Sequence, residues 1–324
     1  MKRFILLTVI VIFMLPALSF ARIWRVNNTP GIVADFTTAQ AAHDAAAAGD
    51  TLHFEPSALN YGTLTMTKRL VLLSLGSFLA ENPNQQYAAV SGTLGSITIN
   101  AGSENSVLSV NSNGNIVLSN INSITLLRCR TEAGSFSLSN ADNIVILNCF
   151  VGTVISIGSG SSNVIVSNNI VRGAIQSSGT GVSSTITNNV ISVIGGTNSS
   201  FLNATVQNNI FVILSTSITS TSSVLQNNLC SGNQLPAGNS NNVNMATVFV
   251  NPAGTVDNQF LLLPGGGNPA IGGGIGGVDC GAFGGSTPFV LGMIPAIPSI
   301  YKLQTPITPV GNSMDVIIST RSNN

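Results

Sequence analysis

Apolar and polar residues alternate along the middle of this chain in a unit that recurs about every twenty residues. The clearest mark of the unit is an Asn-Asn pair followed by an aliphatic residue, and its occurrences are separated by 20, 20 and 19 residues. An aliphatic residue also stands two positions before each pair, and apolar residues two apart are typical of strands. The marks are Val166, Asn168-Asn169-Ile170, Ile186, Asn188-Asn189-Val190, Val206, Asn208-Asn209-Ile210, Leu225 and Asn227-Asn228-Leu229. A period this regular indicates a solenoid.

The length of the unit decides what each coil contains. A strand-helix-strand unit needs about thirty residues, whereas about twenty suffice for three short strands joined by turns. Stacked coils then place equivalent residues one strand spacing apart, roughly 4.8 Å, with each strand paired to the coils on either side. We therefore predict an all-β fold, a single-stranded parallel β-helix with coils of about twenty residues.

The first asparagine of each pair is predicted to mark a bend. Asparagine tolerates the left-handed backbone conformation, and its amide can donate to one neighbour while accepting from the next. Equivalent residues of successive coils would then form a structural ladder, and a ligand-binding asparagine row is the alternative interpretation. The ladder residues are Asn148, Asn168, Asn188, Asn208 and Asn227.

The ends of a β-solenoid need covering, because their strand edges would otherwise pair with other chains. The segment from Thr37 to Ala48 is rich in alanine, starts with threonine and is followed by Gly49. This pattern predicts a short N-terminal capping helix. A strand is expected next, over residues 51–55.

Two stretches near the start and two near the end carry a family resemblance. FTTAQAAHDAAAAGDTL at 36–52 and KRLVLLSLG at 68–76 resemble the N-terminal entry and first coil of pectin-lyase-like right-handed β-helix proteins. NPAIG at 268–272 and VDCGAFGG at 278–285 resemble the closing coil of many bacterial surface β-helix proteins. The resemblance implies a right-handed winding. It says little about activity, because this solenoid serves lyases, hydrolases, esterases, adhesins and tail fibres.

The first residues are typical of a secretory signal peptide. Lys2 and Arg3 precede an apolar run over residues 4–15 that is too short to cross a bilayer, and Ser19 and Ala21 fit cleavage after Ala21. No later segment resembles a membrane span. We expect a secreted or cell-surface protein, with the periplasm as an open alternative.

The chain is accordingly divided into three parts: a signal peptide at 1–21, a β-helix domain with its N-terminal cap at 22–285, and a proline-containing tail at 286–324. The prolines of the tail exclude a helix and disfavour a central strand. We expect the tail to pack on the solenoid or extend from it, with a binding or anchoring tail as the alternative.

Charge is scarce, since charged residues make up 7% of the chain and the two signs are balanced at eleven each. Without a basic patch, nucleic acid is not an expected partner. The four cysteines lack the close spacing of zinc sites, and the coils hold too few acids for a calcium cage, so no metal or cofactor is expected. Cys129 and Cys149 lie one period apart and should stack, as a thiol ladder or as a disulfide.

The charged residues of the coils provide the candidate site. Arg172 lies two periods after Glu132, so the two share a column roughly 10 Å apart, and Arg130 shares a strand face with Glu132. We take Arg130, Glu132 and Arg172 as candidate catalytic residues, with ordinary solvated charges as the alternative interpretation. His43 and His53 are expected to be structural, because no nucleophile accompanies either.

Two classes of function remain open. The favoured one is a non-catalytic structural or adhesive protein that binds extracellular glycan or cell-surface components. The other is a polysaccharide lyase or glycoside hydrolase with Arg130 or Arg172 as base. Several carboxylates and an arginine converging in one cleft would favour the enzyme, and scattered charges the first hypothesis.

Overall fold

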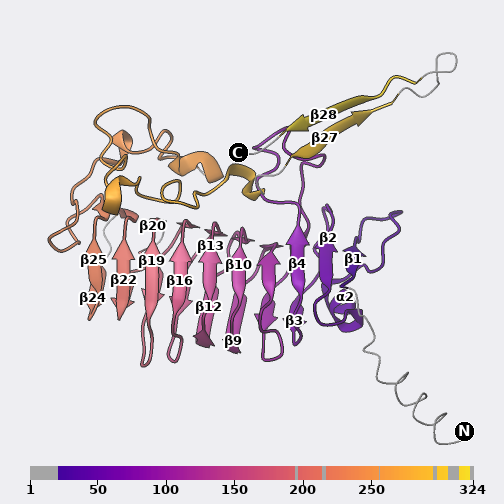
Figure 1. Ribbon diagram of the computed structural model, residues 1–324, viewed down its shortest axis with the longest axis horizontal. Helices are drawn as coiled ribbons and strands as arrows, with labels where there is room; N and C mark the ends of the chain where they lie inside the picture. Colours follow the sequence, from indigo (N-terminus) through magenta and orange to yellow (C-terminus); the bar gives the residue numbers. More distant parts are fainter. Residues whose placement is uncertain are drawn as a thin grey trace, which may run out of the picture.

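The structure is a computed structural model that describes residues 21–193, 196–213, 217–254, 256–294, 298–305 and 314–321. The predicted signal peptide, apart from Ala21, lies outside the described residues. The chain forms a parallel β-solenoid of about nine turns with coils of about twenty residues, which confirms the predicted all-β fold (Figure 1).

Each coil contributes strands to three parallel sheets, which we call A, B and C. Sheet A contains β1 (Ile23–Val26), β2 (Thr51–Phe54), β4 (Val71–Ser74), β7 (Val107–Ser109), β10 (Thr125–Leu127), β13 (Val145–Leu147), β16 (Val164–Ser167), β19 (Ser184–Thr187), β22 (Ala204–Gln207) and β25 (Val224–Gln226). Sheet B contains β3 (Leu64–Met66), β6 (Ile97–Ile99), β9 (Ile116–Asn122), β12 (Phe136–Asp142), β15 (Ile155–Ile157), β18 (Ile175–Ser177), β21 (Ser199–Leu202) and β24 (Ile218–Thr221). Sheet C contains β5 (Thr93–Leu94), β8 (Asn111–Ser112), β11 (Arg130–Thr131), β14 (Phe150–Val151), β17 (Ile170–Val171), β20 (Val190–Val193), β23 (Ile210–Ile213) and β26 (Leu229–Cys230).

The interior of the solenoid is a stack of aliphatic side chains. In sheet A, Leu126 pairs with Ile146, which pairs with Val166, so identical frame positions lie directly above one another. All three side chains are fully buried. Burying a side chain of this size stabilises the fold by about 1.5–3 kcal/mol, which makes the repeated aliphatic position the main source of cohesion between coils.

A short helix, α2 (Ala39–Ala45), lies near the N-terminal end as predicted, with Thr38 as its N-cap. The helix ends three residues earlier than the sequence suggested, because Ala46 already has an extended backbone. Asp50 explains the early end: its carboxylate accepts hydrogen bonds from the backbone of Ala47 at 2.9 Å and from the Trp24 indole at 2.8 Å. No helix among the described residues is long and apolar enough to span a membrane.

The segment 236–294, which we call the cover, runs back along the outside of sheet C (Figure 1). It contains four short 3-10 helices: η1 (Met245–Thr247), η2 (Asp257–Phe260), η3 (Ile275–Gly277) and η4 (Leu291–Met293). The outward residues of five sheet C strands are buried beneath it: Phe150, Ile170, Val190, Ile210 and Leu229. Residues 268–285 belong to this cover and add no coil, in contrast to the closing coil that their resemblance implied.

The proline-containing tail divides into two parts. Its described residues up to 294 complete the cover, and Phe289 and Met293 pack into the cluster on sheet C. Strands β27 (Ser299–Gln304) and β28 (Ile317–Arg321) then form an antiparallel hairpin that projects away from the solenoid (Figure 1). One part therefore packs on the solenoid and the other extends from it.

Candidate functional site

Arg130 and Glu132 form one side-chain unit on sheet C. Arg130 opens β11 and Glu132 follows this strand, so the two side chains point the same way. Their guanidinium and carboxylate groups form an ion pair. The guanidinium carbon of Arg130 also lies 4.0 Å from the centroid of the Phe78 ring, a cation–π distance. Arg130 is therefore held by a carboxylate and by an aromatic ring.

Arg172 lies apart from that ion pair, two coils further along. With Glu132 and Gly152 it lines a cavity of about 260 Å³. Gly152 is required between them, because a Cβ atom on this residue would lie 1.7 Å from the Glu132 carbonyl oxygen. Among the described residues no ion pair joins Glu132 to Arg172. The structure places these two residues in one column but brings Glu132 together with Arg130 instead.

A second cavity, the Arg130 pocket, lies beneath the loop 75–92 that connects β4 to β5. Its volume of about 340 Å³ is at the small end of the range for ligand sites. Its polar lining consists of Ser57, Ser77, Ser91, Thr93, Asn111, Glu81 and Arg130. Sheet C thus has polar outward residues in its first three strands and apolar ones beneath the cover.

A buried amide fixes the floor of the Arg130 pocket. The Asn111 side-chain amide donates to the Gly76 carbonyl at 2.8 Å and to the Ser91 hydroxyl at 2.6 Å, and its oxygen accepts a hydrogen bond from the Ser77 hydroxyl. These bonds tie both ends of the loop to β8. The pocket is therefore preorganised, which lowers the entropic cost of binding a ligand.

The chemistry available in the Arg130 pocket is that of hydrogen bonding. Arg130 is already paired with Glu132, and Glu81 is the one carboxylate in the lining. Most glycoside hydrolases use a pair of carboxylates, whereas the lining of this pocket contains one. Within the described residues there is no group of three or more His, Cys, Asp or Glu side chains that could hold a metal ion.

The five predicted ladder asparagines form a file of bends and bind the cover. All have the left-handed backbone conformation, with φ between 52° and 58°. Their side chains do not bond one another, which corrects the predicted amide-to-amide arrangement. Their partners in the cover are the carbonyls of Thr287 for Asn148, of Ala282 and Gly284 for Asn168, of Asp279 for Asn188 and of Gly273 for Asn227, and the backbone N–H of Ile275 for Asn208. We call these five residues the asparagine clamp.

The second asparagine of each pair, which the sequence interpretation passed over, forms the amide ladder. Asn169, Asn189, Asn209 and Asn228 are fully buried. Each donates its side-chain amide to the next side-chain oxygen at 2.8–2.9 Å, and the row ends on Asn239. A sequence signal for their burial existed, because two consecutive apolar residues follow each pair and both faces of such a strand must be covered.

The two histidines differ in their surroundings. His43 is buried in α2, where its Nε2 accepts the backbone N–H of Thr67 at 3.1 Å and its Nδ1 lies 3.0 Å from the Asp44 carboxylate. His53 lies on the outer face of β2, and burial lowers the pKa of its imidazole. Neither lines the Arg130 pocket.

Cys129 and Cys149 stack as the period requires and are free thiols. The backbone N–H of Cys129 donates to the Cys149 sulfur at 3.3 Å, so the two residues continue the amide ladder into the earlier coils. Burial raises the pKa of the Cys149 thiol well above its ordinary value. A buried, protonated thiol is chemically inert.

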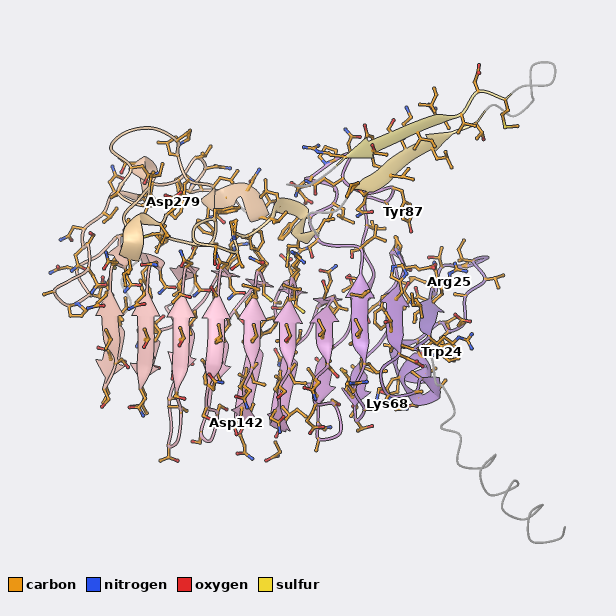
Figure 2. The ribbon with its side chains drawn as sticks, viewed as in Figure 1. Trp24, Arg25, Lys68, Tyr87, Asp142 and Asp279 are labelled. Carbon is orange, nitrogen blue, oxygen red and sulfur yellow. The ribbon has the colours of Figure 1, made fainter. Side chains whose placement is uncertain are left out.

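Among the remaining charges, Arg22 pairs with Asp35 and Arg25 with Glu55 at the N-terminal end of the solenoid. Figure 2 shows Arg25 at the N-terminal end, Lys68 and Asp142 along one edge of the solenoid, and Asp279 in the cover. Comparison of the chain with protein-family models, with curated proteins and with solved structures gives no match.

Proposed function

We propose that this chain is an exported, non-catalytic β-helix protein of the pectin-lyase-like, right-handed kind, with a structural or adhesive role and extracellular glycan as its ligand. The observation that carries the proposal is the outer face of sheet A, which has no charged residue from β7 to β25. Its outward residues are Val107, Ser109, Thr125, Leu127, Val145, Leu147, Ile165, Ser167, Thr185, Thr187, Thr205, Gln207, Val224 and Gln226. A rigid face of hydroxyl, amide and aliphatic groups matches the alternating polar and apolar surface of a neutral polysaccharide.

The Arg130 pocket, which is separate from the sheet A face, also supports glycan as the ligand. Its hydroxyl and amide groups can hydrogen-bond a sugar, and its volume accommodates a unit of monosaccharide size. The competing hypothesis of a polysaccharide lyase or glycoside hydrolase needs several carboxylates in one cleft. Each of the two cavities on sheet C has one carboxylate and one arginine in its lining, which favours the non-catalytic role.

The ligand is tested with the purified mature protein on a glycan array. We expect binding to at least one extracellular polysaccharide, weakened tenfold or more by Thr187→Lys in the middle of the sheet A face. Val250→Lys, on an exposed position of the cover, is the matched control and should bind as the wild type does. If both variants lose binding, or if neither does, the outer face of sheet A is not the glycan-binding surface.

The absence of catalysis is tested on a panel of acidic and neutral polysaccharides. We expect no shortened or unsaturated products. Turnover that disappears in Arg130→Ala or Arg172→Ala would reject the non-catalytic role and support the enzyme.

Export is tested by fractionating cells that produce the full chain with a C-terminal tag. The mature protein should start at Arg22 by mass spectrometry and lie outside the cytoplasm. Uncleaved protein in the cytoplasm would overturn this part of the proposal.

A further inference from the structure

The hairpin formed by β27 and β28 has one apolar face. A bulge lies between Ile300 and Lys302, so Ile300 and Leu303 point to the same side. Leu303 is opposite Ile318, which adds a third apolar side chain to this face. We call Ile300, Leu303 and Ile318 the hairpin face.

The opposite side of the hairpin is mostly polar, with Ile317 as an apolar residue on it. Lys302 pairs with Ser319, Ser299 with Arg321, and Gln304 with Ile317 across the two strands. A strand pair with such a division normally packs its apolar side on another surface. An isolated two-stranded hairpin is marginally stable in water, so the hairpin face needs a partner.

The solenoid of the same chain does not provide that partner. Ile300, Leu303 and Ile318 are 55–64% exposed, and the hairpin projects away from the sheets (Figure 1). Its root is fixed by a hydrogen bond from the Ser299 hydroxyl to the Gln85 carbonyl. Figure 2 places Tyr87, which is also exposed, beside this root.

A groove with exposed aliphatic residues lies close to the root on sheet A. The Leu73 groove has a volume of about 270 Å³. Its lining combines apolar and polar residues, which are Ile23, Leu73, Leu75 and Met293, and Thr51, His53, Ser74, Gln86 and Ser109. Leu73 is 38% exposed and Ile23 is 65% exposed. No other described segment of the chain fills the groove.

From these two surfaces we propose that the chain forms a two-fold homodimer, in which the hairpin face of each copy lies in the Leu73 groove of the other. In a two-fold arrangement each contact occurs twice, so both unfilled surfaces of both copies are used. A six-residue ribbon is about 20 Å long and about 10 Å wide, which gives a total buried area on the order of 800 Å² for the two contacts. That area is below the standard range, so the dimer should be weak, with a dissociation constant in the micromolar range or above.

The dimer is tested by sedimentation equilibrium of the mature protein between about 5 and 500 μM. We expect a reversible monomer–dimer equilibrium. Ile318→Glu on the hairpin face should weaken it at least tenfold, whereas Ile317→Glu should not, although both side chains are 57% exposed and adjacent. Leu73→Glu in the groove should weaken it equally, and Ile165→Glu, also 38% exposed on sheet A, should leave it unchanged.

Mixing the two defective variants identifies the mode of contact. An Ile318→Glu chain keeps an intact groove and a Leu73→Glu chain keeps an intact hairpin, so the mixture should associate more strongly than either variant alone. A mixture that associates no more strongly than either variant alone would overturn the reciprocal contact. Weaker association of Ile318→Glu together with unchanged association of Leu73→Glu would overturn it as well. A wild-type protein that stays monomeric throughout this range would overturn the dimer. Circular dichroism of each variant verifies the fold.

Discussion

The side-chain amide of Asn189 donates to the side-chain oxygen of Asn209 at 2.9 Å, one coil away, with both residues fully buried. Each of these amides also donates to a backbone carbonyl, Asn189 to Val166 and Asn209 to Ile186. The ladder thus satisfies polar groups at a place where water is excluded. A buried polar network of this kind is stabilising only while every member has its partner.

Asn189→Ala should destabilise the solenoid by about 2–6 kcal/mol, because it removes the acceptor of the Asn169 backbone N–H and of one N–H of the Asn169 side-chain amide, at about 1–3 kcal/mol for each unsatisfied group. Urea denaturation followed by circular dichroism measures the change. Gln207→Ala, which removes a longer amide contact to Gln226 on the outer face, is the control and should cost less than about 0.5 kcal/mol. If both variants lose the same free energy of unfolding, the buried amide ladder stabilises the solenoid no more than an exposed amide contact does.

Asn168→Gly should loosen the cover while keeping the bend. Glycine adopts the left-handed conformation of Asn168 without strain, but it lacks the amide that bonds the Ala282 and Gly284 carbonyls at 3.0 and 2.7 Å. We expect faster backbone hydrogen exchange at Gly284 and Phe289, measured by mass spectrometry of peptic fragments. Exchange in β16 and β17 should stay as in the wild type. Unchanged exchange in the cover would mean that its apolar contacts alone hold it.

Asp257 should make the stability of the cover depend on pH. Burial raises the pKa of its carboxyl, which accepts hydrogen bonds from the Gly292 backbone N–H at 2.6 Å and from the Asn82 amide. Because the folded pKa lies above the ordinary value of 3.8, this group favours the folded state most at low pH, and its contribution is lost as the pH rises through the raised pKa.

Asp257→Asn isolates that contribution, since the amide oxygen can still accept the Gly292 N–H and carries no charge to bury. The urea midpoint of the variant relative to the wild type should rise with pH and then level off. A difference in urea midpoint between the two proteins that stays constant with pH would refute the raised pKa of Asp257.

All four cysteines should resist thiol reagents in the native protein. Their side chains are buried, and burial raises the pKa of Cys149 strongly and that of Cys280 to about 12, so thiolate is scarce at neutral pH. Titration with a chromogenic disulfide reagent should detect no reactive thiol in buffer and four in denaturant without reductant. Two thiols in denaturant would indicate a disulfide and contradict the free pair Cys129 and Cys149.

The repeating part of the structure could be predicted from the sequence because its contacts recur at a fixed separation. The spacing of the Asn-Asn pairs and the aliphatic residue before them were enough to predict stacked coils, the bend at Asn168 and the shared face of Arg130 and Glu132. Each of these features depends on local backbone geometry or on a neighbour one coil away.

The tertiary structure alone decided what covers sheet C and that the first asparagine of each pair contacts this cover. Asn168 contacts residues more than a hundred positions later, and no period links the clamp to the cover. Asn168 and Asn169 are both buried, but after the left-handed bend at Asn168 the first side chain bonds the cover and the second bonds Asn189 of the next coil. The Arg130 pocket and the Leu73 groove likewise depend on loops and tail segments that have no repeat, and contacts between such segments are set by packing in three dimensions.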